Sequence, residues 1–259
     1  MSVAAPGFAP DWPAPRNVRA FVTERGVGGS SYGALNLALH VGDDPQRVAA
    51  NRERLRGALS LPAEPKWLDQ VHGSVVLDLD RDDVAAADGA VTGRTGLVCV
   101  VMTADCLPVA LCTRDGRRVG VAHAGWRGLN AGVLPAAVRA LAGDPEQVVA
   151  WLGPAIGPAA YEVGADVRSA FVDRDAAAER RFAPNARGRW QADLYGLARD
   201  SLRGAGVEAI HGGDFCTFRE AGRFFSHRRE GPCGRMATLV WLDSDPIGPA
   251  EPGNSRDGG

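Results

Sequence analysis

The chain has 259 residues, of which 45% are hydrophobic and 23% are charged, and its formal net charge is −2. These values are typical of a globular protein and exclude a wholly disordered, collagen-like or coiled-coil chain. The near balance of charges leaves no basic surplus that could neutralise a row of phosphates, so we expect no nucleic-acid partner. A single small anionic substrate is compatible with this charge.

The composition changes at the two ends of the chain. Four prolines lie within residues 1–16, and proline and glycine are again frequent from Ser244 onward. We therefore expect a flexible N-terminal tail over 1–16, one catalytic domain over 17–243 and a disordered C-terminal tail over 244–259. The central part shows no internal repeat and no linker long enough to separate two cores.

The sequence also indicates the compartment. The first residues lack the charged and apolar regions of a secretory signal, and the longest strongly apolar run, Leu97 to Met102, is too short to cross a bilayer. The five cysteines form an odd, scattered set without CxxC spacing, which favours a reducing compartment over a disulfide framework. We therefore expect a cytoplasmic monomer without a membrane partner.

Four segments have helical patterns. Asp44 followed by Pro45 is typical of a helix start, and Val48, Leu55 and Leu59 then recur at helical spacing. A wider apolar stripe further along the chain must face a core. The predicted helices are 45–59, 128–142, 163–173 and 192–204.

Seven short segments, β-branched or apolar and bounded by Gly, Asp or Pro, have the pattern of strands. They occur in clusters and do not alternate strictly with the helices. This arrangement predicts a single α+β domain in which helices pack on a mixed β-sheet. The predicted strands are Val75–Leu79, Leu97–Met102, Pro108–Cys112, Arg118–Ala122, Val148–Leu152, Val207–His211 and Ala237–Leu242.

The dipeptide Asp115-Gly116 between two of these apolar segments is a strong signal for a β-hairpin with a two-residue loop. Such a loop fixes the register, so that Pro108 faces His123. Cys106 is then a diagonal neighbour of His123 at the open end of the hairpin, with their backbones about 7–8 Å apart. A thiolate and an imidazole at that distance can bind one metal ion.

His72, which is followed by a glycine at a predicted strand entrance, is a third candidate ligand. A set of His72, Cys106 and His123 leaves a tetrahedral zinc ion one open position, as in catalytic zinc sites. Zinc lowers the pKa of bound water to about 7, which produces hydroxide at neutral pH. Three carboxylates are available to orient these ligands or to carry protons, and spacing alone does not rank them: Asp69, Asp88 and Asp105.

Five ordered motifs connect the chain to a known family. They are DQVHG (69–73), TADCLPV (103–109), AHAGWRG (122–128), LGPAIGPAAYEVG (152–164) and FFSHRR (224–229), preceded by SSYGALNLALHVGDD (30–44) and the pair Asn51-Arg52. With them the chain resembles the YfiH family, also called the laccase-domain or multicopper polyphenol oxidoreductase family. The resemblance spans about residues 20–242. It implies a single-domain α+β fold with a metal ion held by His72, Cys106 and His123.

The resemblance also implies an activity on purine nucleosides. Members are linked to phosphorolysis of adenosine, inosine, guanosine or methylthioadenosine, and to deamination of adenosine. We therefore predict a zinc-dependent purine nucleoside enzyme, with nucleoside and phosphate as its small-molecule partners. Guanidinium groups bind phosphate well, so Arg127, Arg228 and Arg229 are the candidate substrate-binding residues.

Two other enzyme activities stay open. The first is an amidase that edits peptidoglycan precursors, with either the same metal site or Cys106 as a nucleophile activated by His123. The second is a copper-dependent polyphenol oxidase, with copper in place of zinc. Multicopper sites require many histidines, and this chain has five, which disfavours the second activity.

A non-enzymatic alternative is a structural zinc ion in a partner-binding module. It has the least support among these hypotheses. Structural zinc sites have four protein ligands, whereas three candidates are found here. Four further thiols are expected to be buried or without a chemical role: Cys99, Cys112, Cys216 and Cys233.

Overall fold

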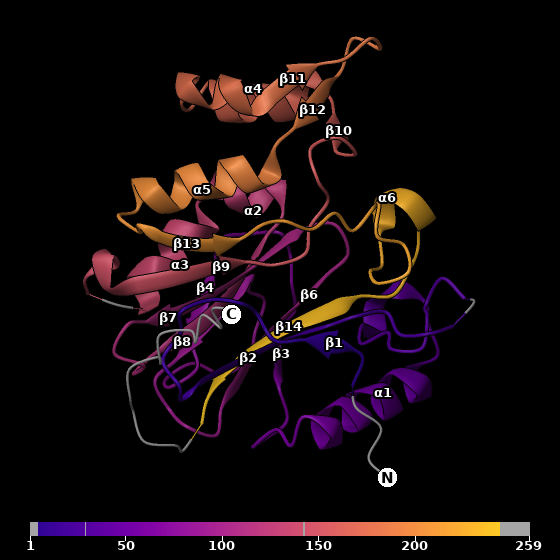
Figure 1. The fold of residues 1–259 in the computed structure, drawn as a ribbon, viewed down its shortest axis with the longest axis vertical. Coiled ribbons are helices and arrows are strands. Elements are labelled where there is room, and N and C mark those ends of the chain that lie inside the picture. Colours follow the sequence, from indigo (N-terminus) through magenta and orange to yellow (C-terminus); the bar gives the residue numbers. More distant parts are fainter. Residues whose placement is uncertain (1–4, 29, 142, 244–259) are drawn as a thin grey trace, which may run out of the picture.

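The computed structural model describes residues 5–28, 30–141 and 143–243. In these segments two mixed β-sheets face each other, and helices cover their outer faces (Figure 1). Helix α1 (Pro45–Ala58) packs outside the first sheet, and α2 (Trp126–Ala131), α3 (Val133–Leu141) and α5 (Leu194–Gly204) pack outside the second. The predicted α+β domain with mixed β-structure and packed helices is confirmed, and the β-structure is divided between sheets.

The first sheet has the strand order β1-β2-β14-β6-β3 in the described part of the chain. Strand β14 pairs antiparallel with β2 and β6, whereas β3 pairs parallel with β6. Strand β14, the last in the described part of the chain, therefore lies in the middle of this sheet, and β1 lies at its edge. The bounds are β1 Gly7–Phe8, β2 Val18–Thr23, β3 Lys66–Trp67, β6 Val98–Thr103 and β14 Met236–Leu242.

The second sheet has the order β13-β9-β7-β8-β5-β4 among the described residues. Its centre is the predicted hairpin, in which β7 and β8 pair antiparallel with Pro108 opposite His123. The register predicted from the Asp-Gly loop is thus confirmed. The bounds are β4 Val76–Asp78, β5 Gly89–Thr92, β7 Leu107–Thr113, β8 Val119–Ala124, β9 Val148–Leu152 and β13 Ala209–Gly212.

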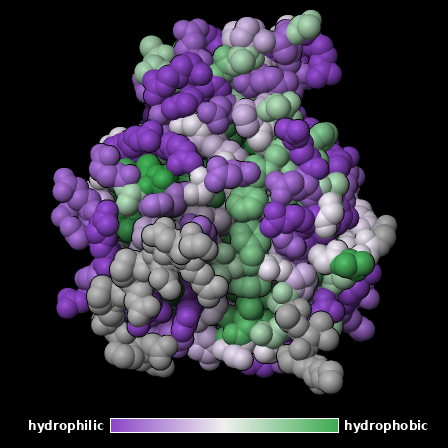
Figure 2. Space-filling view, viewed as in Figure 1, coloured by the Kyte–Doolittle hydropathy of each residue, from purple (hydrophilic) through white to green (hydrophobic). Residues whose placement is uncertain are grey.

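A small unit lies above the second sheet at the top of Figure 1. It consists of a three-stranded sheet with order β10-β12-β11, helix α4 and a 3₁₀ helix η3. Most of its visible surface is hydrophilic (Figure 2), because its apolar side chains point toward α2 and α5. The bounds are β10 Glu162–Val163, α4 Ala165–Val172, η3 Ala176–Arg181, β11 Phe182–Pro184 and β12 Trp190–Ala192; the remaining short helices are η1 Leu39–Val41, η2 Pro145–Gln147 and α6 His227–Glu230.

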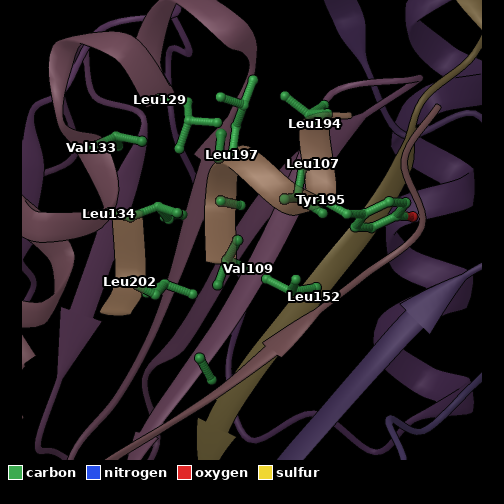
Figure 3. Close-up of a cluster of buried hydrophobic side chains, with 14 of the residues drawn as sticks. Leu107, Val109, Leu129, Val133, Leu134, Leu152, Leu194, Tyr195, Leu197 and Leu202 are labelled. Atoms are coloured by element: carbon green, nitrogen blue, oxygen red, sulfur yellow. The ribbon is translucent and has the colours of Figure 1, made fainter. Parts of the chain in front are cut away.

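Two of the buried apolar layers flank the second sheet. One fills the space between the second sheet and helices α2, α3 and α5, where Leu107, Val109 and Leu152 meet Leu134 and Leu202 (Figure 3). The other lies between the two sheets and includes side chains from β2, β6, β14 and the hairpin. Because both faces of the hairpin are covered, β7 and β8 are buried along their whole length. The open end of this hairpin is therefore a rigid support for a site.

The predicted helix 128–142 is wrong as a single element. The structure has two helices, α2 and α3, separated by Gly132 at φ 92°. A left-handed residue ends a helix, and glycine adopts this conformation without a steric penalty. The apolar periodicity continues through the break, which is why the pattern alone predicts one helix.

The region predicted as a flexible N-terminal tail is partly structured. Strand β1, at Gly7–Phe8, pairs with β2, and the ring of Phe8 lies 5.3 Å from that of Phe215. Pairing across a sheet edge can order a terminal segment that has no pattern of its own. Residues 1–4 and the predicted C-terminal tail, 244–259, lie outside the described residues.

Candidate metal centre

The structure brings His72, Cys106 and His123 together. One potential ligand atom from each lies within 4.8 Å of the other two. The Cys106 Sγ and His72 Nε2 atoms are 4.0 Å apart, and the two imidazole rings meet edge to face with centroids 4.8 Å apart. No other group of three or more such side chains with this proximity occurs in the part of the chain that the structure describes.

The hairpin supplies two of these side chains. His123 lies within β8, and Cys106 directly precedes β7. Gly125 follows β8 opposite Cys106, and a Cβ atom placed on it would lie 2.9 Å from the Cys106 Sγ atom. A side chain at position 125 would therefore displace the thiol, which explains a glycine at this point of the AHAG motif.

His72 reaches the same point from the loop between β3 and β4. Its backbone is in the left-handed region, with φ 61°, which is unfavourable for a residue with a side chain. The Asp88 carboxylate holds this conformation by accepting hydrogen bonds from three consecutive N–H groups, those of Val71 (3.2 Å), His72 (2.9 Å) and Gly73 (2.6 Å).

The same carboxylate orients His123. The Nδ1 atom of His123 lies 2.7 Å from Asp88 Oδ1, and both side chains are buried. Burial alone would raise the pKa of the Asp88 carboxyl, but hydrogen bonds from His123 and from the backbone outweigh it and lower that pKa. With Nδ1 donating to an ionised carboxylate, Nε2 is available as a ligand atom.

The other two carboxylates have different surroundings. Asp105 has φ 86°, and its side chain accepts hydrogen bonds from Thr217 Oγ1 (2.6 Å) and from the Arg228 N–H (2.7 Å). It thus fixes the turn that presents Cys106. Asp69 is exposed. Its backbone forms a β-bridge with Ala86, and its carbonyl oxygen accepts a hydrogen bond from the Ala87 N–H. The structure therefore singles out Asp88 as the carboxylate in contact with the candidate ligands.

Cys106 and His123 form an electrostatically coupled pair. Burial alone would raise the pKa of the Cys106 thiol, but the neighbouring His123, and His72 after it, reverse this and lower the pKa to about 6. Burial alone would lower the pKa of His123, but Cys106 and Asp88 raise it. The metal-free pair is therefore a thiolate beside an imidazolium at neutral pH.

Alkylation of the metal-free protein should report this thiolate. Thiolate is the reactive form, so the rate at Cys106 is expected to rise between about pH 5 and 7 and to level off above, whereas an ordinary thiol with a pKa near 8.5 continues to gain reactivity up to about pH 9. Burial raises the pKa of both Cys99 and Cys112, which serve as internal controls. Peptide mapping after iodoacetamide treatment measures each site, and a Cys106 rate that keeps rising from pH 7 to 9 would contradict the coupled pair.

The donor set fits a metal ion. Two imidazoles and a thiolate are ligands that zinc prefers, with bonds of about 2.0–2.3 Å. Bonds of this length at tetrahedral angles place donors about 3.5 Å apart, so the three atoms need to move inward only slightly. The Asp88–His123 contact adds the carboxylate that commonly supports a metal-bound histidine.

Two cavities are lined by residues of the family motifs. The smaller has a volume of about 230 Å³ and contains the three candidate ligands. The larger has a volume of about 560 Å³ and lies between α2, α6 and the small three-stranded unit. The two linings share no residue, but the consecutive residues His227 and Arg228 contribute one to each. The smaller cavity is also lined by His40, Gln70, Met102, Thr103, Ala104, His227 and Arg235.

Sequence reasoning did not find His40, His227 or Arg235. His40 comes from the SSYGALNLALHVGDD motif, and Arg235 directly precedes β14. His227 begins α6, and its Nδ1 lies 2.8 Å from the Gly231 carbonyl oxygen. Each of the three lies in or near a family motif, which is the one indication that the sequence offers. Spacing along the chain does not show that these motifs lie side by side in the fold.

The three predicted arginines have different positions. Arg127 and Arg228 are exposed and line the larger cavity, where their guanidinium groups lie over the rings of Trp126 (4.5 Å) and Tyr161 (5.6 Å). Arg229 instead donates hydrogen bonds to the carbonyl oxygens of Thr217, Phe218 and Phe224. It also forms an ion pair with Glu230. Both Nη groups of Arg229 are thus engaged and its charge is paired with Glu230, which does not fit its predicted role as an anion ligand.

Arg229 is therefore expected to matter for stability. Arg229→Ala leaves several partly buried carbonyl groups without their donor and should lower the free energy of unfolding by about 2 kcal/mol. Urea denaturation measures this. Arg127→Ala is the matched control, because its exposed side chain should cost at most about 0.5 kcal/mol. Equal losses in the two variants would contradict the structural role.

Comparison with known proteins shows the family of the chain. The model of the family described as "Multi-copper polyphenol oxidoreductase laccase" matches residues 19–243. The chain belongs to this family. The resemblance inferred from the motifs is thus confirmed.

Several named relatives match nearly the whole chain. A purine nucleoside phosphorylase of Pseudomonas aeruginosa is 52% identical over 238 residues, which is 91% of this chain and 98% of the relative. The purine nucleoside phosphorylase YfiH of Escherichia coli is 50% identical over 240 residues, with the same coverage of 91% and 98%.

Solved structures share the fold. The crystal structure of a Neisseria meningitidis protein superposes with a TM-score of 0.87 at 44% identity and covers 92% of this chain and 99% of its own. Bacillus licheniformis YfiH gives a TM-score of 0.79 at 30% identity, covering 90% of this chain and 98% of its own. Within the described residues, no helix has the length and apolar character needed to cross a membrane.

Proposed function

We propose that the protein is a metal-dependent purine nucleoside enzyme that cleaves the bond between base and sugar by phosphorolysis. The observation that carries the proposal is the convergence of His72, Cys106 and His123 in one cavity. A second, larger cavity has Trp126 and Tyr161 in its lining. The names of the relatives from Pseudomonas aeruginosa and Escherichia coli support the substrate class. The nitrogen and sulfur donors favour zinc over copper(II) as the resident metal.

The larger cavity suits the nucleoside. Its volume of about 560 Å³ is within the range of small-molecule sites, about 300–1,000 Å³. Trp126 and Tyr161 provide apolar ring surfaces, and Arg127 and Arg228 lie over those rings. A flat purine has the right shape to stack on such surfaces, and the arginines can donate to its acceptor atoms or to the sugar.

The reaction requires an ordered exchange of bonds. A phosphate oxygen forms a bond to C1′ of the ribose while the C1′–N9 bond breaks, and N9 takes the electron pair and a proton. In deamination, the second predicted activity, water replaces the amino group at C6 and ammonia leaves.

In either reaction the chain's own residues position the centre, because Asp88 holds both His72 and His123 in place. A zinc ion held there would supply Lewis acidity and lower the pKa of coordinated water to about 7.

Product analysis tests the proposal. Zinc-loaded protein is incubated with adenosine or inosine, with and without phosphate, and the products are separated by chromatography. Phosphate-dependent release of adenine or hypoxanthine together with ribose 1-phosphate supports phosphorolysis, and phosphate-independent formation of inosine from adenosine supports deamination. Absence of these products beyond the level of a Cys106→Ala control would end the proposal.

A second candidate is an amidase acting on peptidoglycan precursors. One observation favours it: Asp88, His123 and Cys106 form a chain of contacts in which the thiol is held as a thiolate, as in nucleophilic cysteine enzymes. A chelator separates the two candidates. If chelation leaves amide hydrolysis intact while thiol alkylation abolishes it, the covalent mechanism is favoured over the metal-dependent one.

The copper-oxidase alternative has less support. All five histidines lie within the described residues, and only His72 and His123 belong to the three-donor group. A multicopper oxidase needs a soft single-copper site in addition to a histidine-rich cluster. Elemental analysis of protein produced without added copper decides this point, and copper in place of zinc, together with phenol oxidation, would favour the oxidase.

A further inference from the structure

The smaller cavity carries a positive charge that the three candidate ligands do not explain. Among the described residues that line it, Arg235 is the one with a permanent charge, and none is acidic. The Nη1 group of Arg235 donates to the carbonyl oxygens of Cys233 (2.7 Å) and Gly234 (3.1 Å), which fixes the guanidinium in place.

This charge is not balanced by a carboxylate. Within residues 5–28, 30–141 and 143–243, no ion pair is recorded for Arg235, whereas Arg25 and Arg229 both pair with Glu230. A half-buried guanidinium that is fixed by carbonyl groups and lacks an acidic partner is a ready binding group for an oxyanion.

The buried amide of Asn36 links the segment that carries His40 to Arg235. The Oδ1 atom of Asn36 accepts hydrogen bonds from the N–H groups of Arg235 and Ala38, both at 3.0 Å. Asn51 in turn donates to the Asn36 carbonyl oxygen at 2.9 Å. These hydrogen bonds hold the motif that carries Asn36 and His40 next to the start of β14, and Asn51 supports the motif from α1.

This anchoring brings further polar groups to the cavity. Burial and then the nearby Arg235 guanidinium lower the pKa of His40, which favours its neutral form. Arg52 is not in the cavity lining, but its charge also lowers the pKa of His40; it is held by a hydrogen bond to the Leu37 carbonyl oxygen (2.9 Å) and placed over the Trp67 ring (3.9 Å). The Asp69 carboxylate acts on His40 in the opposite direction.

We propose that Arg235 and His40 form a phosphate subsite beside the metal centre. The proposal rests on the phosphorolysis proposed above and assigns its second substrate to a specific place. The cavity, at about 230 Å³, is below the usual range for small-molecule sites of about 300–1,000 Å³, so it suits a compact anion better than a nucleoside. This assignment places phosphate beside His72, Cys106 and His123 and leaves the larger cavity for the nucleoside.

Direct binding tests the subsite without any catalytic readout. Inorganic phosphate is titrated into the zinc-loaded full chain by calorimetry. Arg235→Gln is expected to weaken phosphate binding about 10–100-fold, the effect of losing a charged hydrogen-bonding partner. Arg117→Gln, an exposed arginine in the distant loop of the hairpin, should leave it unchanged, and Arg235→Lys should retain part of it. Metal content and thermal unfolding of each variant show whether it is folded.

A second measurement uses the wild-type protein, so it does not depend on the folding of a variant. Phenylglyoxal modifies accessible arginines, and mass spectrometry identifies the modified positions. Phosphate should protect Arg235 and leave Arg127 and Arg228 reactive. Protection of the latter two instead, or phosphate binding that is lost in Arg228→Gln but kept in Arg235→Gln, would overturn the proposal. Lack of phosphate binding by the wild type at millimolar concentration would also overturn it.

Kinetics separates this proposal from the proposed function. If the wild type cleaves nucleosides and Arg235→Gln leaves the KM for phosphate unchanged, the function stands and the subsite is wrong. If phosphate binding depends on Arg235 but no nucleoside is cleaved, the subsite stands and the function is wrong. A raised KM for phosphate with an unchanged KM for the nucleoside supports both.

Discussion

Cys106→Ala is expected to remove the bound metal ion and to lower kcat/KM on nucleosides at least about 100-fold, because loss of a group that merely supports a ligand already costs about 10–100-fold in metal affinity or activity. Cys106 provides the one thiolate of the donor group, and without it only the two histidines of that group are left as ligands. Metal per chain is measured by inductively coupled plasma mass spectrometry after gel filtration, and kcat/KM is measured with zinc in excess.

The control for this variant is Cys112→Ala, which removes a thiol from β7, the strand that Cys106 directly precedes. Cys112 is fully buried between the two sheets, and its side chain is not part of the donor group. It should keep its metal ion while losing some stability to the cavity that it leaves. A Cys106→Ala protein that retains one metal ion per chain and normal activity would exclude the proposed centre.

The sequence predicts the pair Cys106 and His123 because their proximity is a local property. An Asp-Gly loop determines which residues of the two strands face each other, and both side chains lie close to that loop along the chain. Helices α1, α4 and α5 and most longer strands are predicted well for a similar reason. Their caps and periodicity are contained in the segment itself, as with Asp44 at the start of α1.

Features that depend on distant partners could not be predicted in this way. Strand β1 has two residues, and only its pairing with β2 makes it a strand. Arg235 approaches His40 because β14 inserts between β2 and β6, a strand order that no local pattern specifies. The role of Asp88 is hidden for the same reason. Its carboxylate accepts hydrogen bonds from the loop at His72, which precedes it in the chain, and from His123 in β8, which follows it.

Asp88→Asn is expected to weaken metal binding about 10–100-fold and to reduce activity similarly, since this is the usual effect of losing the carboxylate behind a metal-bound histidine. The native carboxylate accepts hydrogen bonds from the N–H groups of Val71, His72 and Gly73 and from His123. An asparagine has one oxygen, and its amide nitrogen would face an N–H donor on the other side. The left-handed backbone at His72 would then lose part of its support, and His123 would lose the acceptor that orients its ring.

Two measurements on Asp88→Asn separate positioning from general stability. Competition with a chromophoric chelator gives the metal affinity, and urea denaturation of the metal-free protein gives the free energy of unfolding, which should fall by about 1–3 kcal/mol for a buried donor left unpaired. Asp69→Asn is the matched control, because it removes the same charge from an exposed side chain close to the same loop. If both variants lose metal affinity equally, the effect of Asp88 is electrostatic attraction alone. A loss confined to Asp88→Asn, and present in folded protein, means that the geometry it imposes on His72 and His123 makes the metal centre.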